Sequence, residues 1–152
     1  MKKRMILLLT VVASILCLAG CGSKAVEIQE INASAEKETL SVQVKSNKDV
    51  AAKDCKIKIY LTQDNDTVKG TVYRTCEIKE DLKKKQRVLY MYFTSAGAWD
   101  VKGNVTYKGN QAKDGDKIMI SNALTEFGSG AKLKVSFLID GDVVAEKTIT
   151  LE

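Results

Sequence analysis

The feature that most constrains the fold is an alternation of apolar and polar residues, which recurs from residue 26 to the end of the 152-residue chain. Neighbouring side chains of a β-strand point to opposite sides, so a period of two is typical of strands with one buried face. No long stretch carries the stripe of period 3.6 that marks an amphipathic helix. We predict strands at 26–33, 39–46, 55–62, 70–79, 87–94, 98–107, 117–121, 132–140 and 143–151. Short strands at this spacing predict an all-β, antiparallel sandwich.

Turn-forming residues separate these runs. Asn, Asp and Gly accept positive φ and hydrogen-bond to their own backbone, so clusters of them favour turns. Such clusters occur at 47–49, 64–66, 108–110, 114–116 and 140–142. The last of them separates two apolar runs and is the clearest predicted hairpin.

The first half of this region is similar to bacterial immunoglobulin-like modules. Leu40-Ser41-Val42-Gln43-Val44, followed by Ser46-Asn47-Lys48-Asp49, resembles the second strand and adjoining turn of many such modules. The strand with Ile57, Ile59 and Leu61 and the stretch 78–88 continue the resemblance. It implies an immunoglobulin-like β-sandwich for residues 26–152. The tryptophan on the third strand and the cysteine spacing of antibody-type domains are missing, which leaves the strand topology open.

The N-terminal segment is of another kind. Met1-Lys2-Lys3-Arg4 is cationic and residues 5–19 are mostly apolar, which is typical of a signal peptide. The apolar run is shorter than the ~20 residues that a bilayer-spanning helix needs, and no second such run follows. Leu18-Ala19-Gly20-Cys21 then resembles the lipobox of bacterial lipoproteins.

The lipobox resemblance implies a diacylglycerol thioether on Cys21 and cleavage between Gly20 and Cys21. Residues 1–20 would then be the signal peptide and residues 21–25 the lipidated N-terminus with a short tether. The implied location is the extracytoplasmic face of the cell membrane, where two acyl chains hold a protein stably. The alternative is an ordinary secretory signal or N-terminal anchor in which Cys21 is incidental.

Cleavage would change the charge balance of the chain. Of its 24 basic residues, Lys2, Lys3 and Arg4 leave with the signal peptide, so 21 remain against 19 acidic residues. No basic stripe is left, and nucleic acid is therefore not an expected partner. The cationic run at 83–87 is predicted to be a solvated turn; the alternative is a contact with anionic lipid or wall polymer.

The composition excludes several chemistries. The chain has no histidine, so triads, proton relays and zinc sites that use imidazole are excluded. It also has no Gly-x-Ser-x-Gly motif. We therefore predict a protein that is not an enzyme and has no cofactor.

Three Asp-rich turns raise the question of calcium. The turn at 64–66 begins like an EF-hand loop, but Lys69 and Thr75 stand where the glycine and the bidentate glutamate belong. Calcium shared between this turn and those at 114–116 and 140–142 is one interpretation, and plain turn formation is the other. We predict turns and no metal site.

Two cysteines remain in the domain once Cys17 is removed with the signal and Cys21 is assigned to lipid. Alternation places Cys55 and Cys76 among inward-facing residues of two successive strands. An exported domain permits a disulfide, which would stabilise the fold by ~3 kcal/mol. The alternative is two buried thiols that pack as small hydrophobic groups.

Aromatic residues form the candidate binding surface. The alternation that turns the apolar residues of strands 55–62 and 70–79 inward turns Tyr60 and Tyr73 outward. If the apolar residues of strand 87–94 also face inward, Tyr90 and Tyr92 join them on the outside. Four tyrosines on neighbouring strands would form a flat amphipathic surface for a polysaccharide or a protein. Alternatively, they only stabilise the sheet. Trp99 is predicted to lie in the core; the alternative is an exposed aromatic residue that takes part in binding.

Together these observations predict a membrane-anchored, non-catalytic envelope lipoprotein. Its domain would bind another envelope protein or a cell-surface polymer. The alternative is a small enzyme or a metal-dependent ligand binder whose site is assembled from loops.

Overall fold

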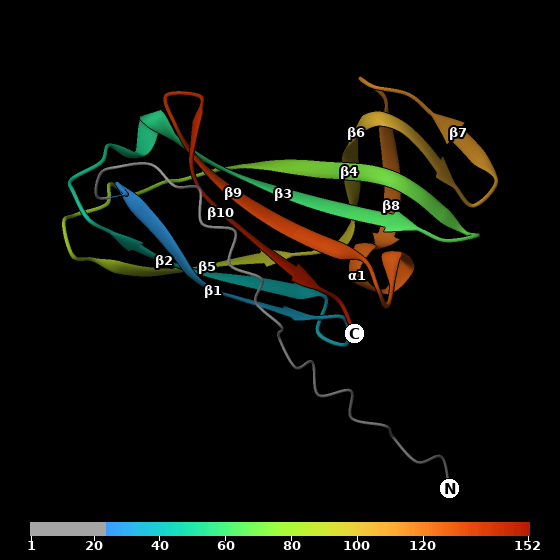
Figure 1. The fold of residues 1–152 in the computed structure, drawn as a ribbon, viewed down its shortest axis with the longest axis horizontal. Coiled ribbons are helices and arrows are strands. Elements are labelled where there is room, and N and C mark those ends of the chain that lie inside the picture. The colour runs from blue at the N-terminus through green and yellow to red at the C-terminus, as the bar shows by residue number, and fades with distance from the viewer. Residues whose placement is uncertain (1–23) are drawn as a thin grey trace, which may run out of the picture.

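The computed structural model describes residues 24–152, so Cys21 and the predicted signal peptide at 1–20 lie outside the described residues. This part of the chain is almost entirely β-structure, arranged in two antiparallel sheets (Figure 1). The small sheet has the strand order β1-β2-β5. It consists of β1 (Val26–Ser34), β2 (Thr39–Ser46) and β5 (Arg87–Phe93).

The large sheet has the order β10-β9-β3-β4-β6-β7, with β8 also paired to β6. Its strands are β3 (Cys55–Asp64), β4 (Val68–Glu77), β6 (Ser95–Tyr107), β7 (Asn110–Ala112), β8 (Lys117–Asn122), β9 (Lys132–Ile139) and β10 (Asp142–Thr150). Each of the nine strands predicted from alternation is found in the described part, which confirms those predictions. Figure 1 shows β6, β7 and β8 gathered at one end of the molecule.

Three elements have no counterpart in the predictions: β7, the 3-10 turn η1 (Ala52–Asp54) and the helix α1 (Ala123–Phe127). The helix has five residues, too few to show a helical stripe. Its ends nevertheless follow ordinary capping rules. Asn122 accepts a hydrogen bond from the backbone N–H of Thr125, and Gly128 follows the helix with a φ of 70°.

One hydrophobic core lies between the two sheets. The small sheet contributes Leu40 and Val42, which are 0% exposed, and the large sheet contributes Ile57 and Val135, also 0% exposed. Trp99 is buried in the same core, which confirms its predicted place. A core of this extent is what a domain of about 130 residues can form without outside support.

The two sheets meet differently along their two edges. On one edge β1 lies against β10, and the Lys147 ammonium donates a hydrogen bond to the backbone oxygen of Gln29 at 2.7 Å. On the opposite edge, β5 pairs with β2 on one side and with no strand of the described residues on its outer side. There the Arg74 guanidinium from β4 donates to the backbone oxygens of Phe93 (3.1 Å) and Ala98 (3.3 Å). The contact with Phe93 thus links β4 of the large sheet to the end of β5.

Within residues 24–152, none of the helices has the length and apolar character needed to cross a membrane.

Candidate functional site

The outer face of the large sheet carries the first pair of predicted tyrosines. Tyr60 on β3 lies directly opposite Tyr73 on β4. Their chain neighbours Ile59 and Val72 are buried, so both tyrosines point away from the core, as predicted. The two ring centroids are 5.5 Å apart and the rings are tilted by 32°. This is a favourable geometry for an aromatic pair.

Three lysines surround the tyrosine pair. The ammonium groups of Lys134 and Lys102 lie 4.6 Å and 5.2 Å from the centroid of the Tyr60 ring. That of Lys58 lies 5.6 Å from the centroid of the Tyr73 ring. Cations at these distances are attracted to the negative face of an aromatic ring. We call these five residues the Tyr60–Tyr73 surface.

The sheet register explains why these lysines gather here. Tyr60 lies opposite Lys134 on β9, and Thr71, next to Val72 on β4, lies opposite Lys102 on β6. Strands β3, β9 and β6 are far apart in the sequence but adjacent or nearly adjacent in the sheet. Sequence reasoning found the tyrosines and missed the lysines, because no local pattern shows which lysine lies beside which ring.

Polar groups continue the surface along the strands. The hydroxyls of Thr62 and Thr71 lie 2.8 Å apart, and the Lys132 ammonium donates to the Thr150 hydroxyl at 2.7 Å. Burial raises the pKa of the Tyr60 hydroxyl, with smaller contributions from Tyr73 and Glu146. The hydroxyl therefore stays protonated near neutral pH and can donate a hydrogen bond.

Tyr90 and Tyr92 do not join this surface, so the expectation of four tyrosines on one face is wrong. Both lie on β5 in the small sheet, opposite Val42 and Leu40 of β2. Those partners are buried, so the tyrosines point inward. Burial raises the pKa of Tyr90 to about 12, with smaller contributions from Cys55 and Glu80. The Tyr92 hydroxyl is buried without a hydrogen-bond partner in the described part of the chain.

The side chains expected to be inward on β5 are outward instead. Leu89, Met91 and Phe93 are 59%, 62% and 72% exposed. The strand carries large side chains on both faces, so its alternation does not tell which face is buried. Pairing with β2 decides which side chains of β5 face inward, because Leu40 and Val42 of β2 belong to the core.

Cys55 and Cys76 are both free thiols in the structure. Cys55 is buried and Cys76 half-buried. Cys76 lies opposite Ile57, so Cys55 is displaced from it by two positions along β3. Residues on such a diagonal are further apart than a disulfide prefers. Burial raises the pKa of both thiols, which makes them poor nucleophiles at neutral pH.

Arg74 is an inward-facing charge that sequence reasoning did not single out. It lies opposite Ile59 on the core side of β4, with its guanidinium carbon 4.5 Å from the centroid of the Trp99 ring. Burial lowers its pKa, and Cys76 acts in the opposite direction. A Cβ at Gly97 would lie 2.0 Å from Arg74 Nη2, so a larger residue there would displace the guanidinium. Arg74 thus holds the end of β5 at Phe93 against the large sheet.

The Asp-rich turns are not brought together as a calcium site would require. Asp64 ends β3, whereas the backbone N–H of Asp140 donates to Asp54, which precedes β3. The length of β3 therefore separates those two turns. Among the described residues there is no group of three or more Asp, Glu, Cys or His side chains arranged to hold a metal ion.

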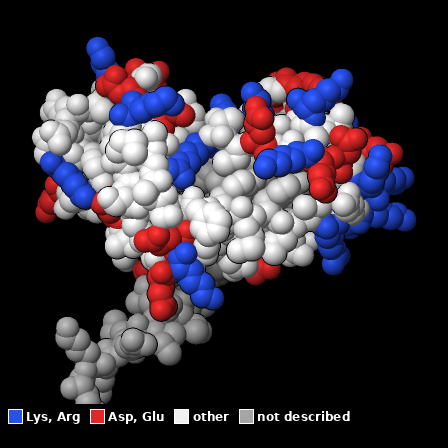
Figure 2. Space-filling model, turned by 180° about the vertical axis from the view of Figure 1, so that it is seen from behind, with Lys and Arg blue, Asp and Glu red and all other residues white. Residues whose placement is uncertain are grey.

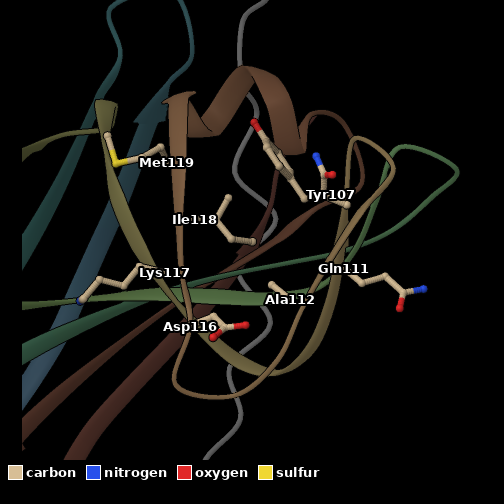
Figure 3. A pocket seen from close by; sticks show the side chains of 8 residues that line it. Tyr107, Gln111, Ala112, Asp116, Lys117, Ile118 and Met119 are labelled. Atoms are coloured by element: carbon tan, nitrogen blue, oxygen red, sulfur yellow. The ribbon is translucent and has the colours of Figure 1, made fainter.

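A hollow of about 460 Å³ lies beside β7 and β8 (Figure 3). Ala112 and Ile118 point into it, and Lys117 points away. Lys117 pairs with Asp100 at 2.6 Å, and the carboxylate of Asp116 accepts a hydrogen bond from the backbone N–H of Lys113. The charged groups around the hollow are thus engaged by the sheet and the turn.

Comparison of the chain with protein-family models, with curated proteins and with solved structures gives no match. The function is therefore inferred from the sequence and from the geometry of the described residues.

Proposed function

We propose that this chain is a lipid-anchored envelope protein, modified at Cys21, whose domain binds an anionic, hydroxyl-bearing surface polymer without catalysis. The observation that supports this best is the tyrosine pair with its three lysines. The lipobox residues Leu18-Ala19-Gly20-Cys21 support the anchor and the location on the extracytoplasmic face of the membrane.

The polymer is chosen on the chemistry of the Tyr60–Tyr73 surface. Aromatic rings offer a flat apolar platform on which the face of a sugar can stack, and their hydroxyls can bond to it. The lysine ammonium groups would contact phosphate or carboxylate groups of the same polymer, since each provides three donors and a positive charge. A flat sheet face suits an extended chain better than a small compact ligand, which prefers a concave pocket.

We further propose that residues 26–152 form an immunoglobulin-like sandwich. Such sandwiches place their first, second and fifth strands in one sheet and their third, sixth and seventh in the other. Here β1, β2 and β5 share the small sheet, and β3, β9 and β10 lie side by side in the large one. In this interpretation β4 has joined the second sheet and β6 to β8 are an insertion. An experimental structure with a different strand order would contradict it.

The polymer proposal is tested with two double variants of the full chain. Lys102→Gln with Lys134→Gln removes two charges beside Tyr60, and Lys37→Gln with Lys113→Gln removes two exposed charges elsewhere as the matched control. Binding to purified anionic wall polymer should fall by about tenfold or more in the first variant and stay unchanged in the control, as expected for charge-assisted contacts.

The tyrosines are tested in the same assay. Tyr60→Ser with Tyr73→Ser should abolish binding while the thermal unfolding transition stays cooperative. If the Lys37/Lys113 control loses the same binding, the interaction is a general attraction between charges and does not need the Tyr60–Tyr73 surface. Unchanged binding in the tyrosine variant would refute the surface.

A protein partner is a second candidate, favoured by β5. Arg74 donates to the backbone oxygen of Phe93 on the side of β5 that does not face β2. The N–H and C=O groups of the other odd-numbered residues of β5 therefore point to that same free side. A groove of about 480 Å³ beside this edge is lined by three acidic residues and one basic residue: Glu77, Glu80, Asp81 and Lys79. An extended basic segment of an envelope protein could add to β5 as a further strand.

The two candidates are separated by site-specific photocrosslinking in cells. A crosslinker at position 91 that captures one basic partner, with none captured from position 73, would favour the protein partner. Capture of polymer from position 73 alone would exclude it.

A further inference from the structure

Residues 24 and 25 lie close to the cationic run at 83–87. Asn47 donates hydrogen bonds from its backbone N–H to the oxygen of Ala25 and from its side chain to that of Lys24, both at 2.8 Å. The preceding Ser46 donates to the backbone oxygen of Gln86 at 2.9 Å and accepts from the N–H of Lys85 at 2.8 Å. Lys24 and Lys85 therefore flank the same short segment at the end of β2.

This end of the domain is rich in exposed cations. We call it the basic end, and its exposed cationic residues are Lys24, Lys48, Lys83, Lys84, Lys85 and Arg87. None of them forms an ion pair within the described residues. Figure 2 shows Lys and Arg side chains gathered at its right edge, which is the left end of Figure 1, where β1 begins.

Acidic groups at this end offset only part of the charge. Asp49 accepts a hydrogen bond from the backbone N–H of Lys84, and Asp81 accepts one from that of Ala52, both at 2.8 Å. Their carboxylates are held against the backbone, whereas the lysine ammonium groups are free to reach outward. Two further exposed acids lie at this end: Glu80 beside the turn, and Glu27 on β1 in the same register row as Arg87. The exposed cations outnumber these four acids.

The geometry points to the basic end as a docking surface for anionic phospholipid headgroups. This inference rests on the proposed lipid anchor. Cys21 precedes Lys24 by three residues, and an extended chain spans at most ~3.6 Å per residue, so Lys24 can lie only about 10 Å from the acyl linkage. That is close to the distance of ~8 Å over which charges are felt at physiological salt.

Two features favour a membrane at the basic end: its positive charge and its closeness to the proposed lipid anchor at Cys21. A weak contact between lysines and anionic headgroups becomes effective when a second signal already holds the protein at the bilayer. The basic end would then face the headgroups, and the domain would stand on the bilayer in one preferred orientation. The Tyr60–Tyr73 surface lies on the outer face of the large sheet and would remain accessible.

The test uses the full chain reconstituted into vesicles of phosphatidylcholine alone or mixed with phosphatidylglycerol. Amide hydrogen exchange of residues 83–93 should be slower on the anionic vesicles. Lys84→Gln with Lys85→Gln should weaken docking by roughly thirtyfold, as two headgroup contacts predict, and remove that protection. The matched control, Lys37→Gln with Lys113→Gln, should retain the protection, and high salt should abolish it in both the control and the unaltered protein.

Two results would overturn the inference. One is equal exchange of residues 83–93 on both kinds of vesicle. The other is protection by a soluble polyanion but not by anionic vesicles, which would assign the basic end to a polymer. The lipid anchor is assessed separately, by the mass of the N-terminal peptide that contains Cys21. An unmodified Cys21 would refute the anchor and leave the exchange result to decide the docking.

Discussion

Removing the hydroxyl of Tyr92 should stabilise the protein, although the change deletes a polar group that could bond in principle. Tyr92 points inward from β5, and its hydroxyl is buried without a hydrogen-bond partner in the described residues. In the unfolded chain the same hydroxyl is bonded to water. Folding therefore loses a hydrogen bond at this atom and gains none. Tyr92→Phe keeps the ring and removes only the unsatisfied atom.

The size of the effect is set by the cost of leaving a buried polar group unpaired, about 1–3 kcal/mol. A phenylalanine ring fills nearly the same space, so little packing is lost. We expect the free energy of unfolding to rise by about 1–2 kcal/mol, near the low end of that cost. For a domain of this size, each kcal/mol corresponds to a rise in Tm of roughly 3–5 °C.

Urea denaturation and thermal unfolding of the two proteins measure the difference directly. Tyr90→Phe is the matched control, since Tyr90 faces inward two residues earlier and its hydroxyl is not a buried unpaired group. That variant should change the free energy of unfolding by less than about 0.5 kcal/mol. A loss of stability in Tyr92→Phe would refute the reasoning, because it would show that the hydroxyl forms a favourable bond in the folded protein.

Three further outcomes are expected. Burial holds the pKa of the inward-facing tyrosines of β5 above the usual 10, with Tyr90 at about 12, so the folded state favours their neutral form. The free energy of unfolding should therefore be unaffected by these groups below pH 10 and fall as pH rises towards 12, which urea unfolding measures; an unchanged value over that range would contradict it. Gly97→Ala should displace Arg74 and lower stability by about 1–2 kcal/mol in urea unfolding, but not in an Arg74→Met background. Cys55 and Cys76 should react slowly with a thiol reagent in the native protein, and both should react after unfolding without reductant. If neither of them reacts then, a disulfide joins them.

Much of the fold could be predicted from the sequence because one physical rule governs it. In strands such as β3, Ile57, Ile59 and Leu61 alternate with polar residues, and only one face can enter the core. The same rule placed Tyr60 and Tyr73 outward. Trp99 followed from it as well. Helix α1 was not predicted, because its five residues span little more than one turn and show no helical periodicity.

The rest of the candidate site depends on pairing between distant segments. Lys134 and Lys102 reach Tyr60 only because β9 and β6 lie on either side of the β3–β4 hairpin. The orientation of β5 is a second case. Both of its faces carry large side chains, so the alternation alone does not show which face is buried. The small sheet resolves it: Leu40 and Val42 of β2 are buried, and the residues beside them on β5 must face the same way.

The two proposed surfaces constrain each other through the direction of the strands. Strand β3 leads away from the end where the chain enters, and Tyr60 lies five residues along it from Cys55, or about 17 Å at the usual rise per residue. The row from Lys134 through Tyr60 to Tyr73 runs across the strands. If the basic end faces the bilayer, that row lies roughly parallel to the membrane. A polymer bound along it would therefore run in the plane of the cell surface, at a height set by the strand length and not by a flexible stalk.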